Sequence, residues 1–490
     1  MDATAEQLIN HLENPLGRGH VPDDSVTGAA GGAACGDLIR LSIALDPQSP
    51  DGRICDAGFD ASGCGATVAA GSATVGLLRD ATLLDAARIG AHDISQELGG
   101  LSAAKRHAAE LAADALHRAL GGAARSHASL RMAAGRTLVA MSGGVDSAVA
   151  ALLVSEAGDE AVGVTLELWS DPENDGELSC CSAQAVRGAR ELAHDLGMPH
   201  LSIDLRAEFR AGVVDGWLAD HASGLTPNPC VRCNGAVRLD AMLELADRLG
   251  SQALATGHYA RVDVACAAEP PVPLLRVAVD ERKDQSYVLS ALAPSSLARL
   301  RFPLGAMRKQ QARELAQRAG LAVARKRDSQ DLCFLAGTRH GDFLERHGGL
   351  GRRSGPIVDL DGGVLGEHAG AHVYTVGQRH GLGLSAPEPL YVLATDARSN
   401  TVTVGPRQAL LTCELRVRDV TLHRAGGVVD GVRVRAHGRT FPCRLAGDLD
   451  AGSHALVGVE LEQPLERTAP GQIACLYAGE LVVGYGTIAA

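Results

Sequence analysis

The sequence predicts a multidomain protein with a doubly wound α/β domain at its centre, and three observations lead to this prediction. Strand-like and helix-like segments alternate between residue 137 and about residue 260, as in a parallel sheet covered by helices. About 125 residues precede that pattern, which is a typical length for a small domain. Short alternating runs separated by Gly, Pro and Asp follow residue 355 and predict a small antiparallel β-barrel at the C-terminus.

Composition is that of a globular protein, with 46% hydrophobic and 21% charged residues. We find no apolar run long enough to cross a membrane and no apolar signal core at the N-terminus, so we expect a cytoplasmic protein without a membrane partner. In that compartment the 12 cysteines predict thiols for packing, metal binding or reaction rather than a disulfide framework. The net charge of −12 argues against DNA as a partner.

The first 125 residues contain a set of metal-ligand side chains. Gly32-Ala33-Ala34-Cys35-Gly36-Asp37, Asp60-Ala61-Ser62-Gly63-Cys64-Gly65-Ala66 and Lys105-Arg106-His107-Ala108 follow Asn14-Pro15. In order and spacing this segment resembles the IscU-type iron–sulfur scaffolds, which implies a small α+β domain with helices on one side of an antiparallel sheet. The family usually has a third cysteine after the histidine, where this chain has Ala108.

Two interpretations of this N-terminal segment remain open. Cys35, Asp37, Cys64 and His107 suit an iron–sulfur cluster or Zn²⁺, and such a domain would deliver sulfur or a cluster to the rest of the chain. Alternatively, the domain is kept only for folding or docking. We expect a helix over Ser102–Leu120, and a connector of small residues between Gly121 and Gly135.

The α/β segment places two motifs at strand ends. Strands are predicted at Thr137–Met141, Ala161–Leu166, Leu201–Asp204 and Ala253–Thr256, and helices at Val149–Ala157, Ala183–Leu196 and Leu239–Leu249. Ligands of such sheets bind at the carboxyl ends of the strands. Ser142-Gly143-Gly144-Val145-Asp146-Ser147 and Gly257-His258-Tyr259 both follow predicted strands, so we expect both to face one cleft.

The motif from Ser142 to Ser147 has the properties of a phosphate-binding loop. Its glycines let backbone N–H groups approach an anion, and the following helix adds its positive N-terminal dipole. Ser142 and Ser147 supply hydroxyl donors, and Asp146 supplies a carboxylate for Mg²⁺. No lysine follows the glycines, so this is not a Walker A loop. The motif resembles the pyrophosphate-binding loop of the ATP pyrophosphatases; an ordinary glycine-rich turn is the alternative.

Two cysteine motifs and a basic segment follow. Cys230 and Cys233 form a C-x-x-C within Thr226–Asn234, and Cys333 lies in Asp328-Ser329-Gln330-Asp331-Leu332-Cys333-Phe334. Arg325, Lys326 and Arg327 precede Cys333, and a cationic setting favours the reactive thiolate. Residues 300–355 carry 12 Lys and Arg against 5 Asp and Glu. This excess indicates either a solvated helical face or a contact surface for a phosphate backbone.

Taken together, these motifs resemble those of the tRNA-specific 2-thiouridylases over residues 136–490. The further motifs are Gly257–Arg261, Lys283-Asp284-Gln285-Ser286-Tyr287 and Thr375–Gly383. The resemblance implies an ATP-dependent transferase that replaces O2 of the wobble uridine of tRNA with sulfur, through an O-adenylate and release of pyrophosphate. It also implies tRNA as substrate and a cysteine desulfurase or another sulfur donor as partner.

The resemblance assigns roles by motif position. It places a persulfide on Cys333 and the second, nucleophilic thiol on Cys233. ATP-binding positions fall on Met141, Ser142, Gly143, Gly144, Val145, Asp146, Ser147, Leu166 and Gly257. Positions near tRNA or the target base fall on Asn228, Pro229, Cys230, His258, Lys283, Asp284, Gln285, Arg435, Ala436 and Gln472. Ala436 replaces a residue that is commonly aromatic in the family.

Cys230 leaves two chemistries open. Some family members have aspartate at this position and others have cysteine. With cysteine, the thiols of Cys230, Cys233 and Cys333 suit three irons of a [4Fe–4S] cluster whose fourth iron would bind hydrosulfide. Alternatively, Cys230 is a spare thiol in a persulfide enzyme.

The remaining cysteines are predicted to be structural. Cys180 and Cys181 precede a helix for which Ser182 is the expected N-cap. We expect packing roles for Cys55, Cys266, Cys413, Cys443 and Cys475, which have no partners at ligand spacing.

The predicted domains are an IscU-like domain (1–125), a linker (126–135), an ATP-pyrophosphatase domain (136–345), a central domain (346–405) and the barrel (406–490). Two other functions compete with the transferase. One is an iron–sulfur or sulfur carrier with a vestigial ATP domain, against which the intact loop at 142–147 argues. The other is a ligase for a small molecule, against which Cys233, Cys333 and the barrel argue.

Overall fold

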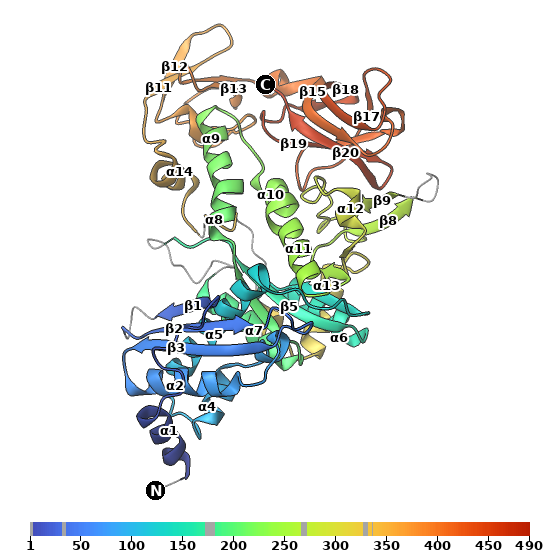
Figure 1. Ribbon diagram of the computed structural model, residues 1–490. Coiled ribbons are helices and arrows are strands. Elements are labelled where there is room, and N and C mark those ends of the chain that lie inside the picture. Colours follow the sequence, from blue (N-terminus) through green and yellow to red (C-terminus); the bar gives the residue numbers. More distant parts are fainter. Residues whose placement is uncertain (1–2, 32–35, 172–181, 266–271, 327–331, 336) are drawn as a thin grey trace.

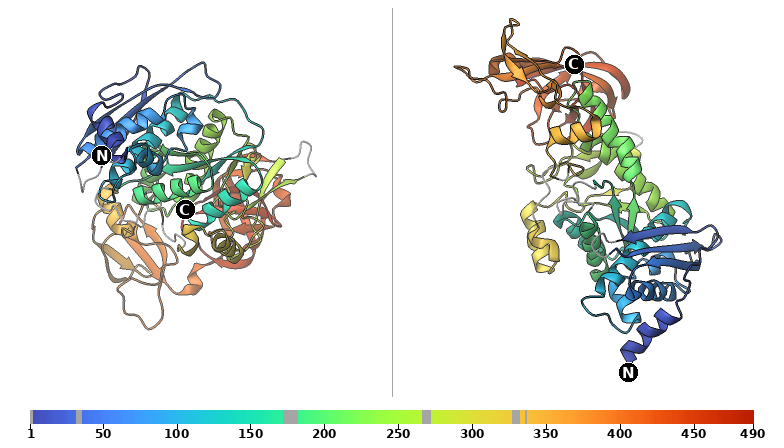
Figure 2. Two further views of the ribbon diagram at one scale, coloured as in Figure 1. Left: turned by 90° about the horizontal axis from the view of Figure 1, so that it is seen from below. Right: turned by 90° about the vertical axis from the view of Figure 1, so that its left-hand side faces the viewer.

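The computed structural model describes residues 3–31, 36–171, 182–265, 272–326, 332–335 and 337–490. An α+β domain and two β-rich domains lie at opposite ends of the molecule, and an α/β domain lies between them (Figures 1 and 2). This arrangement confirms the predicted fold class. Among the helices of the described segments, none has both the length and the apolar content that a bilayer crossing requires.

The N-terminal domain is a three-stranded antiparallel sheet with helices on one side. Its strands, in the order β1-β2-β3, are Val26–Gly31, Leu38–Leu45 and Ile54–Ser62. Its helices are α1 (Ala3–Glu13), α2 (Gly65–Leu77), α3 (Leu83–Ala86), α4 (Ala91–Glu97) and α5 (Arg106–Ser126). The long helix α5 packs across β1 and β2. Alanine dominates its buried face, which lets the helix approach the sheet closely.

The α/β domain contains a parallel sheet in the order β10-β7-β4-β5-β6. In chain order its strands are β4 (Arg136–Ala140), β5 (Glu160–Glu167), β6 (His200–Asp204), β7 (Ala253–Ala255) and β10 (Leu300–Arg301). All four predicted strands are therefore confirmed within two residues. The predicted helices are confirmed as α6 (Val145–Glu156), α7 (Ala183–Asp195) and α11 (Asp240–Arg248), and Ser182 caps α7 by accepting a hydrogen bond from the Ala185 N–H at 3.2 Å.

Alternate residues of the central strands point to opposite faces of this sheet, as strand geometry requires. Val139 and Met141 belong to a core shared with α6, α7 and α13 (Lys309–Arg318). Leu138 and Ala140 belong to a second core, shared with α11 and with α5 of the N-terminal domain. Helix α5 therefore covers one face of the central sheet, beside β6, while its opposite side covers the N-terminal sheet.

The predicted connector is wrong over its first residues, because α5 continues to Ser126. The small residues there allow close packing instead of flexibility. A Cβ at Gly121 would lie within van der Waals overlap of the Ser202 carbonyl oxygen in β6, and one at Gly122 would lie 2.5 Å from Cγ1 of Val26 in β1. The two glycines thus admit a sheet on each side of the helix.

A helical segment between β6 and β7 extends toward the β-rich domains (Figure 1). Its parts are α8 (Arg206–Phe209), the π-helical turn η1 (Arg210–Val214), α9 (Asp215–Ala222), α10 (Pro229–Arg232) and the second π-helical turn η2 (Cys233–Leu239). The strands β8 (Arg261–Ala265) and β9 (Val272–Arg276) follow β7, and the short helices α12 (Pro294–Leu297) and η3 (Ala322–Arg325) flank β10 and α13. Helix α14 (His340–Gly348) packs on α9 and leads to the central domain.

The two β-rich domains differ in topology. The central domain has strands β11 (Gly355–Val358), β12 (Val364–His368), β13 (Tyr391–Asp396) and β14 (Thr401–Gly405), in the order β12-β11-β14-β13. The C-terminal strands are β15 (Leu411–Leu422), β16 (Gly431–Arg433), β17 (Phe441–Leu445), β18 (Gly452–Glu466), β19 (Ile473–Ala478) and β20 (Leu481–Ile488). They close into a barrel because β15 pairs with both β18 and β20. Strand β16 is the shortest of these and ends at Arg433.

Candidate active site

The loop from Ser142 to Ser147 joins β4 to the N-terminus of α6. Gly143 has a φ of +64°, and a Cβ there would lie 2.9 Å from the Ala185 carbonyl oxygen, so this position requires glycine. Gly144 is the N-cap of α6. The Ser147 hydroxyl accepts a hydrogen bond from the Ser142 N–H at 3.1 Å. The loop is thus a preformed turn at a helix N-terminus, which is a favourable site for an anion.

Two lysines from the basic segment reach this loop. The Lys309 ammonium donates to both carboxylate oxygens of Asp146 at 2.7 and 2.8 Å, and the Lys326 ammonium donates to the Gly143 carbonyl at 2.9 Å. The sequence-based assignment omitted both residues because they lie more than 160 positions from the loop. Their only signal in the sequence was the positive charge of residues 300–355.

The second predicted motif meets the loop as expected. A Cβ at Gly257 would lie 2.6 Å from the Ser147 nitrogen, so this glycine permits the close approach. The Tyr259 hydroxyl donates to Asp146 at 3.0 Å. The backbone N–H of Tyr259 donates to the Gln285 side chain at 2.9 Å, which fixes its orientation. Gly257, Tyr259 and the loop therefore face the same end of the sheet.

The remaining predicted nucleotide positions lie beside the loop. The Met141 N–H donates to the Val164 carbonyl at 2.8 Å, and Leu166 lies two residues further along β5. Met141, Val145 and Leu166 are buried. His258 is also buried, its ring contacts the Thr256 hydroxyl at 2.8 Å, and burial lowers the pKa of His258 to about 3. This histidine is consequently neutral at physiological pH.

The C-x-x-C motif lies on α10 and η2. Asn228 caps α10 by accepting a hydrogen bond from the Cys230 N–H at 3.1 Å, and Pro229 occupies the first helical position, where a missing N–H costs least. Cys233 is buried and Cys230 is partly buried. Burial raises the pKa of the Cys230 thiol, and the nearby Arg238 opposes this effect.

Cys333 is partly buried and is followed by an aromatic anchor. The Phe334 ring lies 5.2 Å from Trp217 and 5.2 Å from Phe343, and it also contacts Trp169 and Phe209. Phe209 ends α8 and Trp217 lies in α9, and α10 and η2 pack against η1 between them. Cys230, Cys233 and Cys333 are therefore carried on segments that pack against one helical element. Asp328, Ser329, Gln330, Asp331 and Arg327 lie outside the described residues.

Three predicted tRNA positions form bonds within the protein. Asp284 is buried and accepts hydrogen bonds from the Ser286 hydroxyl at 2.7 Å and from Arg433 of the barrel at 2.6 Å. Gln285 orients Tyr259, as described above. The Gln472 amide donates to the Thr226 carbonyl at 2.6 Å, which ties the barrel to the loop before the C-x-x-C.

Three further predicted tRNA positions are more accessible than the buried His258 and Pro229. Arg435 is exposed, and its guanidinium lies near Gly377 of the central domain, while Ala436 and Lys283 are partly exposed. The structure therefore brings parts of both β-rich domains to the same edge of the helical segment.

The predicted packing cysteines divide into two groups. Cys443 and Cys475 are buried, as expected. The prediction is wrong for Cys55 and Cys413, which are exposed. Cys180, Cys181 and Cys266 lie outside the described residues.

A separate group of metal-ligand atoms lies in the N-terminal domain. One carboxylate oxygen of Asp37, the Cys64 sulfur and one ring nitrogen of His107 all lie within 4.8 Å of one another. The Thr67 hydroxyl donates to Asp37 at 2.7 Å, and this bond contributes most to holding the pKa of Asp37 below its usual value. A mixed oxygen, sulfur and nitrogen donor set fits zinc or iron. Cys35, the fourth predicted ligand, lies outside the described residues.

Family models match four successive segments of the chain. Residues 3–126 match a NifU-like N terminal domain, and residues 135–337 match the tRNA methyl transferase HUP domain. Residues 341–406 match the tRNA methyl transferase PRC-barrel domain, and residues 427–488 match the aminomethyltransferase beta-barrel domain.

Curated relatives match either the whole chain or its last three domains. The "Bifunctional protein NifU/MnmA" of Rubrobacter xylanophilus is 43% identical over 99% of this chain and 98% of its own length. The "tRNA-specific 2-thiouridylase MnmA" of Roseiflexus castenholzii is 40% identical over 72% of this chain and 99% of its own length. The protein of the same name from Thermobifida fusca is 44% identical over 72% of this chain and 95% of its own length.

Proposed function

The chain belongs to the family of tRNA-specific 2-thiouridylases, in the form fused to a NifU-like domain, and we propose that it thiolates the wobble uridine of tRNA at the expense of ATP. The observation that carries this proposal is the loop at 142–147, which combines a helix N-terminus with the ammonium groups of Lys309 and Lys326. In this proposal the loop binds the activating nucleotide, and the thiols of Cys233 and Cys333 deliver sulfur.

In the first step, O2 of the uridine attacks the α-phosphate of ATP and pyrophosphate leaves. The N–H groups of the loop and the two lysines stabilise the negative charge of the departing pyrophosphate. Asp146 offers the carboxylate oxygens that Mg²⁺ prefers, and a bound Mg²⁺ would neutralise phosphate charge. Lys309 holds this carboxylate in place until ATP and its metal ion bind.

In the second step, the terminal sulfur of a persulfide on Cys333 attacks C2 of the uridine, and AMP leaves with the former O2. The Cys233 thiolate then attacks the Cys333 sulfur, forms a disulfide bond with it and frees the thiocarbonyl group. A cellular dithiol must reduce that disulfide before the next turnover. The aromatic contacts of Phe334 hold the neighbouring Cys333 segment against α8 and α9, and the segment that carries Cys233 packs against η1 between these two helices.

A cluster-based route is the second form of this proposal, and Cys230 motivates it. Three thiols on segments that pack against one helical element suit three irons of a [4Fe–4S] cluster. A bound cluster would supply an open iron for hydrosulfide. Cys230→Asp separates the two routes, because the persulfide route keeps its activity without iron and the cluster route loses both iron and activity.

The NifU-like domain is proposed to supply the sulfur or cluster. Asp37, Cys64 and His107 are the described residues that would hold a metal or cluster there. A cysteine desulfurase is the proposed source of sulfur, and the covalent link between the domains favours transfer within one chain.

The test measures tRNA-dependent pyrophosphate release and tRNA thiolation side by side, with sulfur from a desulfurase or from free sulfide. Cys333→Ala and Cys233→Ala should keep pyrophosphate release and lose thiolation from the desulfurase. Cys64→Ala should lose activity only with the desulfurase. Pyrophosphate release that ignores tRNA but responds to a metabolite would instead indicate a small-molecule ligase.

A further inference from the structure

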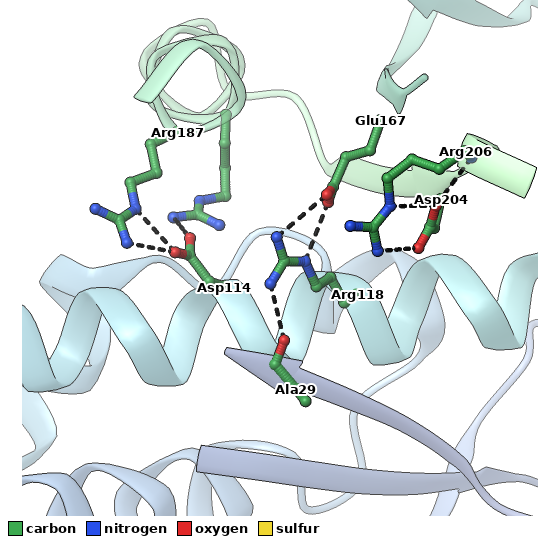
Figure 3. Close-up of polar contacts among 8 residues, drawn as sticks. Ala29, Asp114, Arg118, Glu167, Arg187, Asp204 and Arg206 are labelled. Atoms are coloured by element: carbon green, nitrogen blue, oxygen red, sulfur yellow. Dashed lines mark hydrogen bonds and ion pairs between the residues drawn. The ribbon is translucent and has the colours of Figure 1, made fainter. Parts of the chain in front are cut away.

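Helix α5 of the NifU-like domain makes polar contacts with the HUP domain along its length (Figure 3). Asp114 accepts hydrogen bonds from Arg187 at 2.6 Å and from Arg190 at 2.9 Å, both in α7. One turn later, Arg118 pairs with Glu167. Arg125 then donates to Glu208 and to the Asp204 carbonyl. The two domains are thus joined by directed bonds as well as by their shared apolar core.

Arg118 bridges the two domains with all three of its nitrogens. Its Nε and Nη2 donate to the two carboxylate oxygens of Glu167, each at 3.1 Å, and its Nη1 donates to the Ala29 carbonyl in β1 at 2.8 Å. Figure 3 shows the Arg118 side chain reaching from α5 to both partners. This fork geometry fixes the guanidinium and the carboxylate in one relative orientation.

Glu167 lies at the end of β5 that faces the nucleotide loop. In the parallel register Ala140 pairs with Val164, so Leu166 is level with Ser142, and Glu167 is the last residue of the strand. The Glu167 side chain is only 9% exposed. Arg206 and Arg190 are further cations in its vicinity, but the Arg206 guanidinium is held by Asp204 at 2.9 and 2.5 Å, and Arg190 donates to Asp114 at 2.9 Å.

We propose that Arg118 is a positioning residue for the ATP site, so that the NifU-like domain supports nucleotide binding as well as sulfur supply. A nearly buried carboxylate that loses its partner must turn toward water or draw water in. For Glu167 either response shifts the end of β5, and with it Leu166 and the edge of the loop. This inference rests on the proposed use of ATP at that loop.

The test uses the full-length chain with tRNA and free sulfide, so that sulfur delivery by the NifU-like domain does not limit the rate. Arg118→Ala should raise the KM for ATP on the order of tenfold and leave kcat at saturating ATP near that of the wild type. Arg118→Lys keeps the charge and should recover part of the loss. Arg125→Ala removes a comparable bond from the same helix, further from the loop, and should leave the KM unchanged.

Two results would overturn the inference: a wild-type KM in Arg118→Ala, or an equal rise in Arg125→Ala, which would indicate general loosening of the interface. If Arg118→Ala does not fold, Arg118→Gln retains more of the side chain and still removes the charge that pairs with Glu167. A raised KM in that variant supports the inference, and an unchanged KM overturns it. Absence of tRNA-dependent pyrophosphate release from the wild type would refute the proposed function instead.

Discussion

Asp146 accepts hydrogen bonds from the Lys309 ammonium and the Tyr259 hydroxyl. Without such partners, the negative charge of this carboxylate would repel the phosphate groups of a ligand in the proposed site. The lysine compensates that charge, and in the proposed function both groups would become available together to ATP and a metal ion. Local spacing predicted Asp146, because the loop is one contiguous motif. It did not predict Lys309, since only the folded chain brings α13 to the loop.

Lys309→Ala should therefore reduce pyrophosphate formation more than the substitution of any other basic residue in the segment 300–355. The substitution removes a cation from the phosphate site and leaves Asp146 uncompensated, so we expect kcat/KM for ATP to fall about 10²-fold to 10³-fold. Arg308→Ala is the matched control, because Arg308 is exposed on the preceding position. Steady-state pyrophosphate release measures both variants, and equal losses would show that only the general charge of the segment matters.

At the scale of elements, α5 packs against two sheets at once, which the sequence did not predict. An amphipathic helix has one apolar face, but α5 is buried on two sides by sheets of different domains. Its last turns are rich in Gly and Ala, a composition that is also typical of a linker. The sequence therefore predicts a helix end at Leu120, whereas α5 continues to Ser126. The strands of the central sheet were easier to predict, because each is a short apolar run between turn residues.

Gly121→Ala should destabilise the protein, since the new Cβ would overlap the Ser202 carbonyl and force β6 away from α5. We expect a loss of about 1–3 kcal/mol in the free energy of unfolding. Gly188→Ala in α7 is the matched control, because no atom lies within 4 Å of its Cβ position, and it should stabilise by roughly 0.5–1 kcal/mol. Chemical denaturation measures both, and a neutral Gly121→Ala would contradict the close packing of α5.

At the scale of the whole molecule, the four domains are held by different kinds of contact. The barrel is tied to the α/β domain through Asp284–Arg433, Gln472–Thr226 and the pairing of β9 with β20. The NifU-like domain shares a continuous apolar core with the sheet, and Cys475, Tyr477 and Val482 of the barrel belong to the same core. Sequence motifs predicted the order of the domains, but docking depends on contacts between residues far apart in the chain, such as Gly121 and Ser202, which no local pattern records.

This shared core predicts that the full chain unfolds its NifU-like and HUP domains in one transition, and that residues 127–490 alone are much less stable. Removing α5 uncovers the face of β6 that carries Leu201 and Ile203, which are at most 2% exposed in the whole chain, and opens the apolar core that they share with Val162 and Val164. At about 1.5–3 kcal/mol for each side chain that becomes exposed, this loss is a large part of the total stability of a typical domain.

Differential scanning calorimetry of the full chain and of two truncations tests the prediction. Deletion of residues 1–13 removes α1, which packs on α2, and should preserve the joint transition of the two domains. Deletion of residues 1–126 should lower the melting temperature by more than about 10 °C or cause aggregation. Two relatives match 72% of this chain over 95% or more of their own length, so they have no counterpart of the NifU-like domain. The instability would therefore be specific to this chain, in which α5 covers the sheet. Separate transitions in the full chain, with an unchanged midpoint in the fragment, would instead describe a tethered and independent module.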